Sequence, residues 1–490
     1  MKEVINFIDY LKQNVVKLSF IFGSYLLVAI YLGSINYYYI DDIARRANGS
    51  TGFAEHYARY LSEYAAHLVQ GDTHLTDLGL TTFILSAVFL GIISSLIVYF
   101  ISENPKMTWG AACASLFIGL NPFSLELLSF RFDTPYMMLS ILVSILPFLW
   151  KEKKILYGLS SILGIFLMYN SYQASSGIYI IFVLFLGLLS FLNTLDIKEH
   201  IMFVGSSAVY YLIATGVYYI EMMFNPQLKE RGDNVSVANL SELPSAVIDN
   251  IKAYFEVYSD ELPALWKFWI FIIFIIFLIQ MVVRYKKSRV VTFLLTLPYV
   301  FITAMLSLGV YIASATELAT VRPRYAYSLA ILLGMIMVYV ASNSKKNIQN
   351  IIGKIAVVIV TYYTFTFSMA YVAALDNQKT DFELQAGELA SHLNVYIRDS
   401  NNTVYINRLF EDSPAYSNSS LNYPILDNLV PSNQLLYWPN IMWYNEITHS
   451  NVNFVAFDFS NIILDEFQLL TSTYNFDIYQ KDNQIYVYMK

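Results

Sequence analysis

The chain has 490 residues, of which 56% are hydrophobic, 16% are aromatic and only 14% are charged. Soluble domains typically have about 45–50% apolar and about 25% charged residues, so this composition excludes an ordinary soluble protein and indicates a polytopic membrane protein. The formal net charge of −7 argues against nucleic acid as a partner, because proteins that bind a phosphate backbone gather Lys and Arg on one face. The single cysteine, Cys113, excludes an intramolecular disulfide and a cysteine-based zinc site.

Apolar runs long enough to cross a bilayer as helices, about 20 residues each, recur along most of the chain. We expect about eleven transmembrane helices, at 18–38, 79–101, 107–121, 134–150, 155–170, 176–193, 201–220, 266–284, 290–313, 326–342 and 351–373. Lys and Arg gather in the loops of one side, as at 151–154, and the positive-inside rule makes that side cytoplasmic. We therefore expect a cytoplasmic N-terminus, an extracytosolic C-terminus and membrane lipids as surroundings.

Three outer segments are too long for simple connections: 39–78, 221–265 and the chain after 374. In the first, apolar residues recur at spacings of three and four, which predicts a helix that lies in the membrane interface or, equally, packs on protein. These residues are Phe53, Tyr57, Tyr60, Leu61, Tyr64 and Leu68.

The composition changes near residue 376, where hydrophobic runs shorten and Asn, Asp and Ser increase. We expect a transmembrane domain over 1–375 and a small extracytosolic α/β domain over 376–490. Its predicted elements are a helix at 381–396, strands at 403–406 and 454–457, and a hairpin around 481–484.

The stretch most informative about function follows the first expected span and reads Tyr37-Tyr38-Tyr39-Ile40-Asp41-Asp42-Ile43-Ala44-Arg45-Arg46. Two adjacent carboxylates, Asp41 and Asp42, are placed at the membrane surface, where ionised groups are costly unless they are solvated or used in function. Helix capping by Asp42 explains one aspartate and leaves Asp41 unexplained. The tyrosines, including Tyr39, are typical of an aromatic belt and less often form a platform for a sugar.

Three arginines, Arg131, Arg322 and Arg324, occupy short outer loops, where the positive-inside rule disfavours cations. Their planar guanidinium groups suit phosphate oxygens. Each has a structural alternative: snorkelling or headgroup binding for Arg322 and Arg324, and for Arg131 a bridge to Asp133 or Asp42. Asp133 then orients Arg131 without touching a substrate.

Other ionisable residues give weaker signals. Glu126 is a lesser candidate in the same region as Arg131, and the six histidines show no metal-ligand spacing. Two outer carboxylates suffice to hold one Mg²⁺ or Mn²⁺ through oxygen, but we predict no metal site.

The segments Tyr39-Ile40-Asp41-Asp42-Ile43-Ala44-Arg45 and Phe130-Arg131-Phe132-Asp133-Thr134-Pro135-Tyr136, together with the exterior C-terminal domain, resemble the bacterial O-antigen glucosyltransferases of the Gtr type II family. Within the wider GT-C superfamily of polytopic glycosyltransferases, an Asp-Asp or Asp-Glu pair in the first long outer loop is similar in type and position. The resemblance in layout covers the whole chain.

The resemblance implies a GT-C-like, all-α bundle that transfers a hexose, glucose above all, from polyprenyl phosphate to a surface glycan with inversion. The implied partners are a polyprenyl-phosphate sugar donor and a lipid-linked or cell-wall glycan acceptor, in the bacterial plasma membrane and without a cofactor. Asp41 and Asp42 are then catalytic, Arg131, Arg322 and Arg324 bind the donor phosphate, and Asp133, Tyr39 and Arg45 support them. The alternatives are a flippase or transporter of a lipid-linked sugar and a polysaccharide polymerase or ligase.

Overall fold

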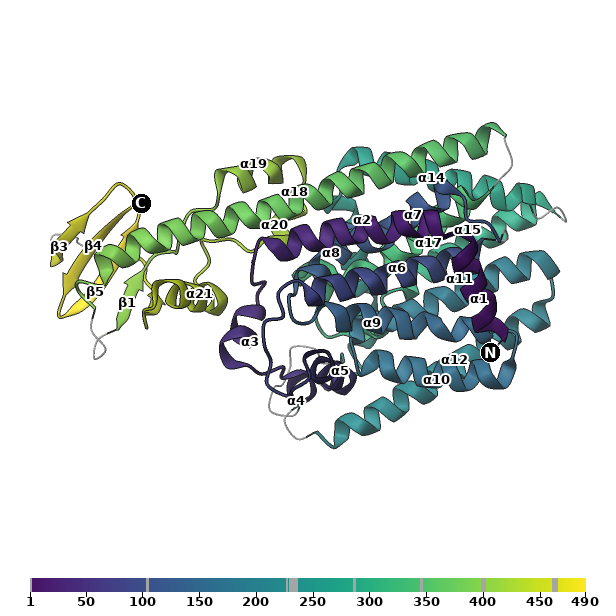
Figure 1. Cartoon of the computed structure of the whole chain (residues 1–490), viewed down its shortest axis with the longest axis horizontal. Helices are drawn as coiled ribbons and strands as arrows, with labels where there is room; N and C mark the ends of the chain where they lie inside the picture. The colour runs from purple at the N-terminus through teal and green to yellow at the C-terminus, as the bar shows by residue number, and fades with distance from the viewer. Residues whose placement is uncertain are drawn as a thin grey trace. The chain divides into compact units, whose positions relative to one another are not determined.

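The computed structural model of the protein describes residues 2–102, 105–225, 228, 237–284, 288–343, 347–397, 402–460 and 466–490. The chain forms two compact units, Met1–Ser34 with Gly49–Met369 and Ile35–Asn48 with Ala370–Lys490. Most of the described residues are helical, and a small sheet belongs to the second unit (Figure 1). In the outer loop expected at 221–265, residues 226–227 and 229–236 lie outside the described residues.

The first unit is built from α-helices and short 3-10 helices. The α-helices are α1 (Lys2–Gln13), α2 (Val15–Ser34), α4 (Phe53–Tyr57), α5 (Tyr60–Gln70), α6 (Thr81–Ile101), α7 (Trp109–Leu120), α8 (Pro122–Ser129), α9 (Thr134–Ile145), α10 (Lys154–Tyr169), α11 (Ser176–Thr194), α12 (Ile197–Met223), α13 (Leu243–Glu261), α14 (Ala264–Arg284), α15 (Arg289–Leu306), α16 (Leu318–Val321) and α17 (Tyr327–Ser342). The 3-10 helices are η1 (Leu146–Trp150), η2 (Gln173–Ser175), η4 (Gly309–Ala313) and η5 (Pro323–Ala326).

Eight helical segments within the described ranges are long and apolar enough to cross a membrane. They are Val15–Ser34, Thr81–Ile101, Gln173–Thr194, Ile197–Met223, Ala264–Arg284, Arg289–Leu306, Pro323–Ser342 and Ile348–Leu393. A ninth span results if the bent pair α7 and α8 is counted as one, and the stretches Thr134–Trp150 and Lys154–Tyr169 are shorter apolar helices. The protein is thus a mostly helical membrane protein, and the count of about eleven spans stays a prediction.

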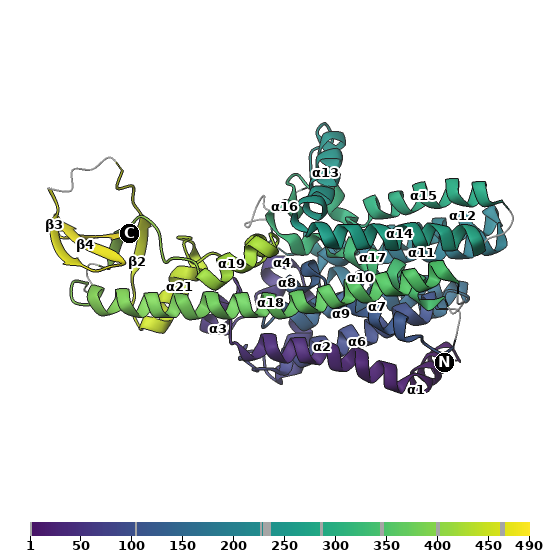
Figure 2. The same ribbon diagram turned by 90° about the horizontal axis from the view of Figure 1, so that it is seen from above.

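Neighbouring helices of the bundle pack closely, with α7 against α17, α2 against α6, and α10 against α12. Figure 2 shows α14 and α15 side by side in the same bundle, where they also contact each other. The start of α11 requires a glycine, because a Cβ atom on Gly177 would lie 1.8 Å from the carbonyl oxygen of Ser307. Small residues permit this close approach of backbones, as is common among membrane helices.

The bend between α7 and α8, 55° in size, follows from the pair Asn121-Pro122. Proline has no backbone N–H to continue α7, so Pro122 instead begins the next helix. The Asn121 side chain accepts a hydrogen bond of 3.0 Å from the Ser124 N–H and so caps α8. Because of this bend, α8 and its residue Glu126 do not continue along the axis of α7.

Two expected helices differ from the structure. The helix expected across 53–68 is divided into α4 and α5, because Ala58 adopts a left-handed conformation with φ of 51°. The helix expected at 381–396 is the last part of α18 (Ile348–Leu393), which runs without a break through the compositional change near 376. A change in hydropathy marks a change of surroundings, and it does not by itself end a helix.

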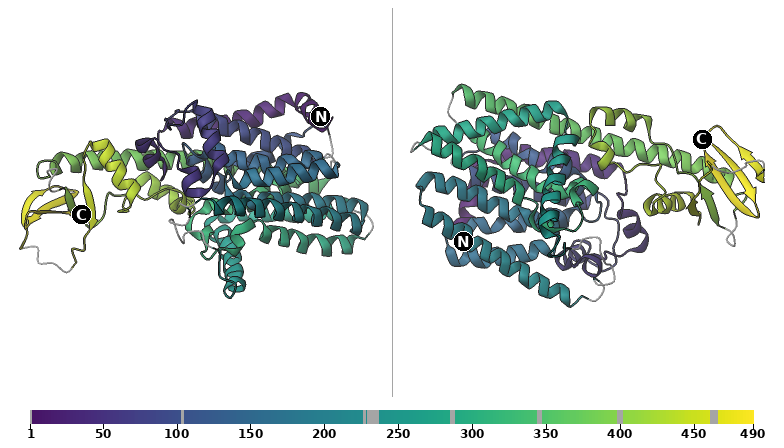
Figure 3. Two further views of the ribbon diagram at one scale, coloured as in Figure 1. Left: turned by 90° about the horizontal axis from the view of Figure 1, so that it is seen from below. Right: turned by 180° about the vertical axis from the view of Figure 1, so that it is seen from behind.

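The second unit contains α3 (Asp42–Asn48), α19 (Pro414–Asn422), α20 (Leu426–Leu429), α21 (Trp438–Thr448) and a five-stranded sheet. The strands are β1 (Thr403–Ile406), β2 (Asn453–Ala456), β3 (Gln468–Ser472), β4 (Phe476–Lys481) and β5 (Gln484–Met489), in the order β2-β1-β5-β4-β3. Figure 3 shows this sheet from two further sides, close to the C-terminus. β1 is parallel to β2 and β5, whereas β3, β4 and β5 are antiparallel neighbours. The predicted strands and the predicted hairpin are confirmed.

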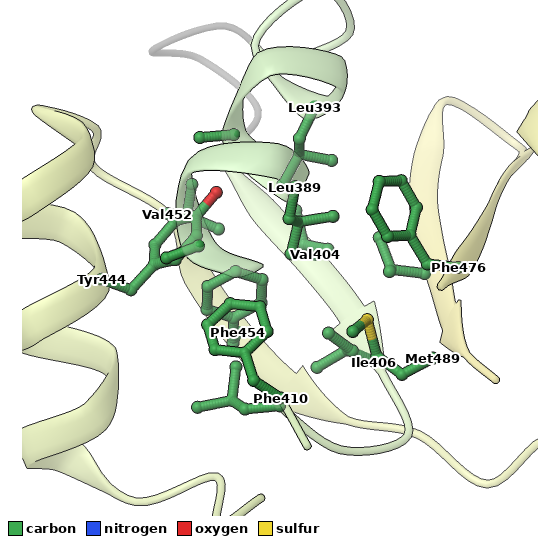
Figure 4. Close-up of a cluster of buried hydrophobic side chains, with 14 of the residues drawn as sticks. Leu389, Leu393, Val404, Ile406, Phe410, Tyr444, Val452, Phe454, Phe476 and Met489 are labelled. Atoms are coloured by element: carbon green, nitrogen blue, oxygen red, sulfur yellow. The ribbon is translucent and has the colours of Figure 1, made fainter. Parts of the chain in front are cut away.

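Alternating side chains of the sheet and the end of α18 form the core of the second unit (Figure 4). Leu389 and Leu393 from α18 pack with Val404 of β1, Phe454 of β2 and Phe476 of β4, and all five are buried. This apolar cluster anchors the final turns of α18 to the sheet.

Candidate active site

The two adjacent aspartates lie where the chain enters α3, in the second unit. Ile40, which precedes them, has φ of 47°, a left-handed conformation that is unfavourable for a β-branched residue. Such strain costs on the order of 1–3 kcal/mol and persists where the surroundings impose it, often at functional sites. The geometry therefore marks the Asp41-Asp42 segment as a candidate on grounds independent of its charge.

The environments of the two carboxylates differ. Asp42 is fully buried, and its Oδ2 accepts a hydrogen bond of 3.0 Å from the backbone N–H of Tyr39. Asp41 is partly exposed, and no described residue is hydrogen-bonded or ion-paired to its side chain. The Asp41 side chain is thus partly open to solvent, whereas that of Asp42 is held by the backbone.

The N-cap position of α3 is occupied by Asp41 and not, as expected, by Asp42, although no described backbone N–H donates to the Asp41 side chain. Asp42 is already the first residue of α3, whereas the backbone carbonyl of Asp41 accepts the helical hydrogen bond from the Arg45 N–H at 3.1 Å. Capping by Asp42 would require α3 to begin at Ile43. Because α3 begins at Asp42, the capping position falls on Asp41.

Tyr39 and Arg45, the two expected supporting residues of this segment, are both buried. The Tyr39 hydroxyl donates a hydrogen bond of 2.8 Å to the carbonyl oxygen of Leu429 at the end of α20. Tyr39 therefore fixes the backbone to which Asp42 is bonded. Burial among aromatic and acidic groups raises the pKa of the nearby Tyr37, with loss of solvation as the main cause, so its hydroxyl stays protonated at neutral pH.

In the first unit, Arg131 is paired with Asp77, a residue that the sequence analysis did not single out. The Nε atom of Arg131 lies 2.7 Å from Oδ1 of Asp77, and one terminal nitrogen donates to the carbonyl oxygen of Gly33 at 3.3 Å. Only 5% of the Arg131 side chain is exposed, so this cation is enclosed by protein and is not a free loop arginine. Asp133, at the start of α9, is also buried.

Arg324 forms an ion pair with Glu126 of α8. A terminal nitrogen of Arg324 is 2.8 Å from Oε1 of Glu126, and the Arg324 backbone N–H donates to Oε2 at 2.7 Å. The guanidinium carbon lies 4.9 Å from the centre of the Phe130 ring and 5.2 Å from that of Tyr325. Arg322 differs, because it is partly exposed and no described residue accepts a hydrogen bond from its side chain.

A third arginine, Arg59, belongs to the same part of the first unit and was missed in the sequence. Its guanidinium carbon lies 4.7 Å from the ring centres of both Tyr57 and Tyr172, and its Nε donates to Gln173 Oε1 at 3.0 Å. Its terminal nitrogens have no acceptor in the described ranges. Stacking on two rings fixes a guanidinium while its fork stays open to an anion.

Tyr172 connects this arginine to Arg324. Burial raises the pKa of its hydroxyl, and the positive charges of Arg324 and Arg59 nearby oppose that rise. The side chain is 1% exposed, yet its hydroxyl oxygen has no hydrogen-bond partner among the described residues. Buried polar groups are normally paired, so the unpartnered hydroxyl marks Tyr172 as a candidate residue of the site.

Two guanidinium groups and a phenol hydroxyl gather in this part of the first unit. We call Arg59, Tyr172 and Arg324 the arginine-tyrosine cluster. Among the described residues there is no group of three or more His, Cys, Asp or Glu side chains suited to a metal ion. The two arginines can hold an anion through charge-assisted hydrogen bonds.

Comparison with known proteins assigns the chain to a family. The model of the family described as glucosyl transferase GtrII matches residues 30–339, which is more than half of the 490-residue chain. The chain belongs to the glucosyl transferase GtrII family. The resemblance read from the two sequence motifs is confirmed, and the match includes the Asp41-Asp42 pair and the arginine-tyrosine cluster. No solved structure matches the chain.

One curated relative of this GtrII family member is an uncharacterized 55.3 kDa protein in the gtrB 5′ region of Salmonella phage P22. The two are 24% identical over 228 residues, which are 45% of this chain and 46% of the phage protein. The match thus spans about half the length of that relative.

Proposed function

We propose that this chain is an integral-membrane inverting glycosyltransferase that moves a hexose, glucose, from polyprenyl phosphate to a surface glycan such as O-antigen. Membership of the glucosyl transferase GtrII family supports glucosyl transfer. The observation that carries the site is the pair of unlike carboxylates, with Asp41 partly exposed and unpaired in the described part and Asp42 buried and hydrogen-bonded.

In the proposed reaction Asp41 is the general base. The oxygen of an acceptor hydroxyl attacks the anomeric carbon, its proton passes to the Asp41 carboxylate, and the bond from that carbon to the phosphate oxygen breaks. The electron pair leaves with polyprenyl phosphate. One displacement inverts the anomeric configuration, and Asp42 positions Asp41 through its bond to the Tyr39 backbone.

The negative charge on the departing phosphate needs cationic partners. The proposed phosphate-binding residues are Arg131, Arg322 and Arg324. Arg324 pairs with Glu126 and lies against the rings of Phe130 and Tyr325. We add Arg59, whose terminal nitrogens lack a described acceptor, and the Tyr172 hydroxyl. Asp77 holds Arg131 in place, and Asp133 remains a proposed supporting residue.

The proposal includes a location and a domain arrangement. The protein lies in the bacterial plasma membrane with eleven spans and a GT-C-like bundle, its N-terminus is cytoplasmic, and residues 1–375 form the transmembrane domain. Residues 376–490 form the extracytosolic domain, and transfer takes place on the outer face. The bias of Lys and Arg toward one set of loops supports this orientation.

The donor is tested by incubating the full chain in phospholipid nanodiscs with polyprenyl-phosphate glucose or with UDP-glucose, with a heat-inactivated sample as blank. We expect release of polyprenyl phosphate, measured by mass spectrometry, through transfer to added glycan or to water. Consumption of UDP-glucose alone would contradict the proposal, because the arginine-tyrosine cluster would then serve another donor.

A further inference from the structure

The second unit contains a groove that the family assignment does not explain. It has a volume of about 480 Å³, and its lining includes Arg46, Glu383, Gly387, Trp443, Glu446 and His449. These residues come from α3, α18 and the end of α21, and all belong to the second unit. Apart from Arg46, each lies beyond residue 339, where the match to the glucosyl transferase GtrII family ends.

The groove lining includes one aromatic side chain, Trp443, and the charged pair Arg46-Glu446, and Tyr38 packs against both Trp443 and Arg46. The ring centres of Tyr38 and Trp443 are 5.5 Å apart, and the guanidinium carbon of Arg46 lies 4.4 Å from the centre of the Tyr38 ring. Arg46 also pairs with Glu446 at 2.9 Å. The Trp443 face suits the C–H face of a sugar ring, while the Arg46-Glu446 pair supplies donors and acceptors for its hydroxyl groups.

The charges of the groove favour a neutral ligand. Glu446 balances Arg46, and the carboxylate of Glu383 lies 3.7 Å from Lys379, so the lining has no excess of positive charge to attract an anion. Charged and polar side chains also make it unsuited to an apolar peptide or an acyl chain. A saccharide without ionised groups fits this chemistry best.

The floor of the groove is open at Gly387 in α18. A Cβ atom built on this glycine would meet no atom within 4 Å, so a larger side chain here would project into free space. Glycine is a poor helix former, and Gly387 lies near the C-terminal end of α18, where it brings no benefit to the helix. A side chain introduced at this position would therefore extend from the groove lining without displacing a neighbouring residue.

Two features of the groove, α3 and Trp443, are shared with the surroundings of the aspartates. Asp42 and Arg46 are four residues apart, which places them on one face of α3, one turn from each other. A second, smaller cavity of about 30 Å³ is also lined by Trp443 and Tyr38, together with Ile40 and Ile43, the residues that flank Asp41 and Asp42. A sugar in the groove is thus placed beside the segment that bears the proposed base.

We propose that this groove binds a neutral saccharide unit of the acceptor glycan, with the sugar ring stacked on Trp443 and its hydroxyl groups bonded to Arg46 and Glu446. This inference rests on the proposed glycosyl transfer. Because most of the groove lies outside the family match, it determines which glycan this chain accepts.

The test compares Gly387→Leu, which places a branched side chain in the groove, with Gly387→Ala, which adds only a methyl group. Both residues are better helix formers than glycine, so both variants retain the fold. Binding of the methyl glycosides of glucose, galactose, rhamnose and N-acetylglucosamine to the full chain in nanodiscs is measured by saturation-transfer NMR. We expect a signal from at least one neutral glycoside for the wild type and Gly387→Ala, and its loss for Gly387→Leu and for Trp443→Ala.

Equal signals from Gly387→Leu and the wild type, or none from any glycoside, would overturn the groove assignment. A signal from methyl glucuronide alone would also overturn it, because a neutral sugar is required. The Asp41→Asn variant separates this inference from the proposed reaction, since it should bind the glycoside as the wild type does while failing to transfer sugar. Unimpaired transfer by Asp41→Asn would count against Asp41 as the base and not against the groove.

Discussion

Arg324 and Glu126 form a buried ion pair, with 2.8 Å between a terminal guanidinium nitrogen and Oε1 of Glu126. The Glu126 side chain is fully buried and that of Arg324 is 14% exposed. Removing one partner of such a pair leaves an uncompensated charge inside the protein, at a typical cost of about 3–5 kcal/mol. Although the sequence places Arg324 and Arg131 in short outer loops, both side chains are largely enclosed by protein and paired with a carboxylate.

We expect Arg324→Ala to lower the melting temperature of the purified protein markedly, while Arg324→Gln combined with Glu126→Gln restores much of it. The double variant removes both charges and keeps hydrogen-bonding groups in the space. Arg322→Ala is the matched control and should melt as the wild type does, because no described residue pairs with its side chain. Equal melting temperatures for Arg324→Ala and Arg322→Ala would show that the ion pair is not a stabilising contact.

Arg59→Ala should raise the KM for polyprenyl-phosphate glucose by about 10- to 100-fold, the loss expected for one charge-assisted hydrogen bond of about 1.5–3 kcal/mol. Arg59→Lys should recover only part of the affinity, because an ammonium group cannot stack between Tyr57 and Tyr172 as a planar guanidinium does. Arg289→Ala, at an exposed position at the start of α15, serves as the control. An unchanged KM for Arg59→Ala would remove this residue from the proposed donor site.

Tyr172→Phe should separate stability from donor affinity. Its hydroxyl is buried without a described partner, so its removal should leave the free protein equally stable or stabilise it by about 1 kcal/mol. The KM for the donor should rise, since the phosphate would lose a hydrogen bond. Melting curves and donor titrations of the same preparation give both values. A destabilised protein with normal donor affinity would mean that the hydroxyl has a structural role.

The orientation in the membrane is tested with single cysteines in a Cys113→Ser background. A membrane-impermeant maleimide added to intact cells should label Ser417→Cys on α19 and should miss Lys12→Cys on α1, and both positions are exposed. Labelling of Lys12→Cys should appear once the membrane is permeabilised. The reverse pattern would place the Asp41-Asp42 segment on the cytoplasmic side and contradict transfer at the outer face.

Local patterns in the sequence were sufficient for much of the fold. Alternating apolar residues around 481–484 correctly gave β4 and β5, and the apolar runs gave the long helices of the bundle. β3 was not predicted, because Gln468–Ser472 has no clear alternation of apolar and polar residues. The sequence did not predict that α18 is one continuous helix. Its composition changes along its length, although the helix itself continues.

The site was predictable only where its residues are neighbours in the chain. Asp41 and Asp42 are adjacent, and so they were found. The partners of the arginines come from distant segments, since Asp77 and Arg131 are 54 residues apart and Glu126 and Arg324 are 198 apart. One clue to Arg59 was present, because it is a cation between tyrosines in an outer loop, but its contacts with Gln173 and Tyr172 depend on the tertiary fold.

The central claim is that Asp41 removes the proton of the acceptor hydroxyl, and the turnover of Asp41→Asn with polyprenyl-phosphate glucose tests it most directly. Asparagine keeps the size and can still occupy the capping position before α3, but it cannot take up a proton. We predict a fall in kcat on the order of 10²–10⁴ with donor binding intact, a smaller fall for Asp42→Asn, and none for the exposed loop control Asp72→Asn. Transfer by Asp41→Asn at the wild-type rate would contradict the account, and an inactive Asp42→Asn in the same assay would assign the base to Asp42.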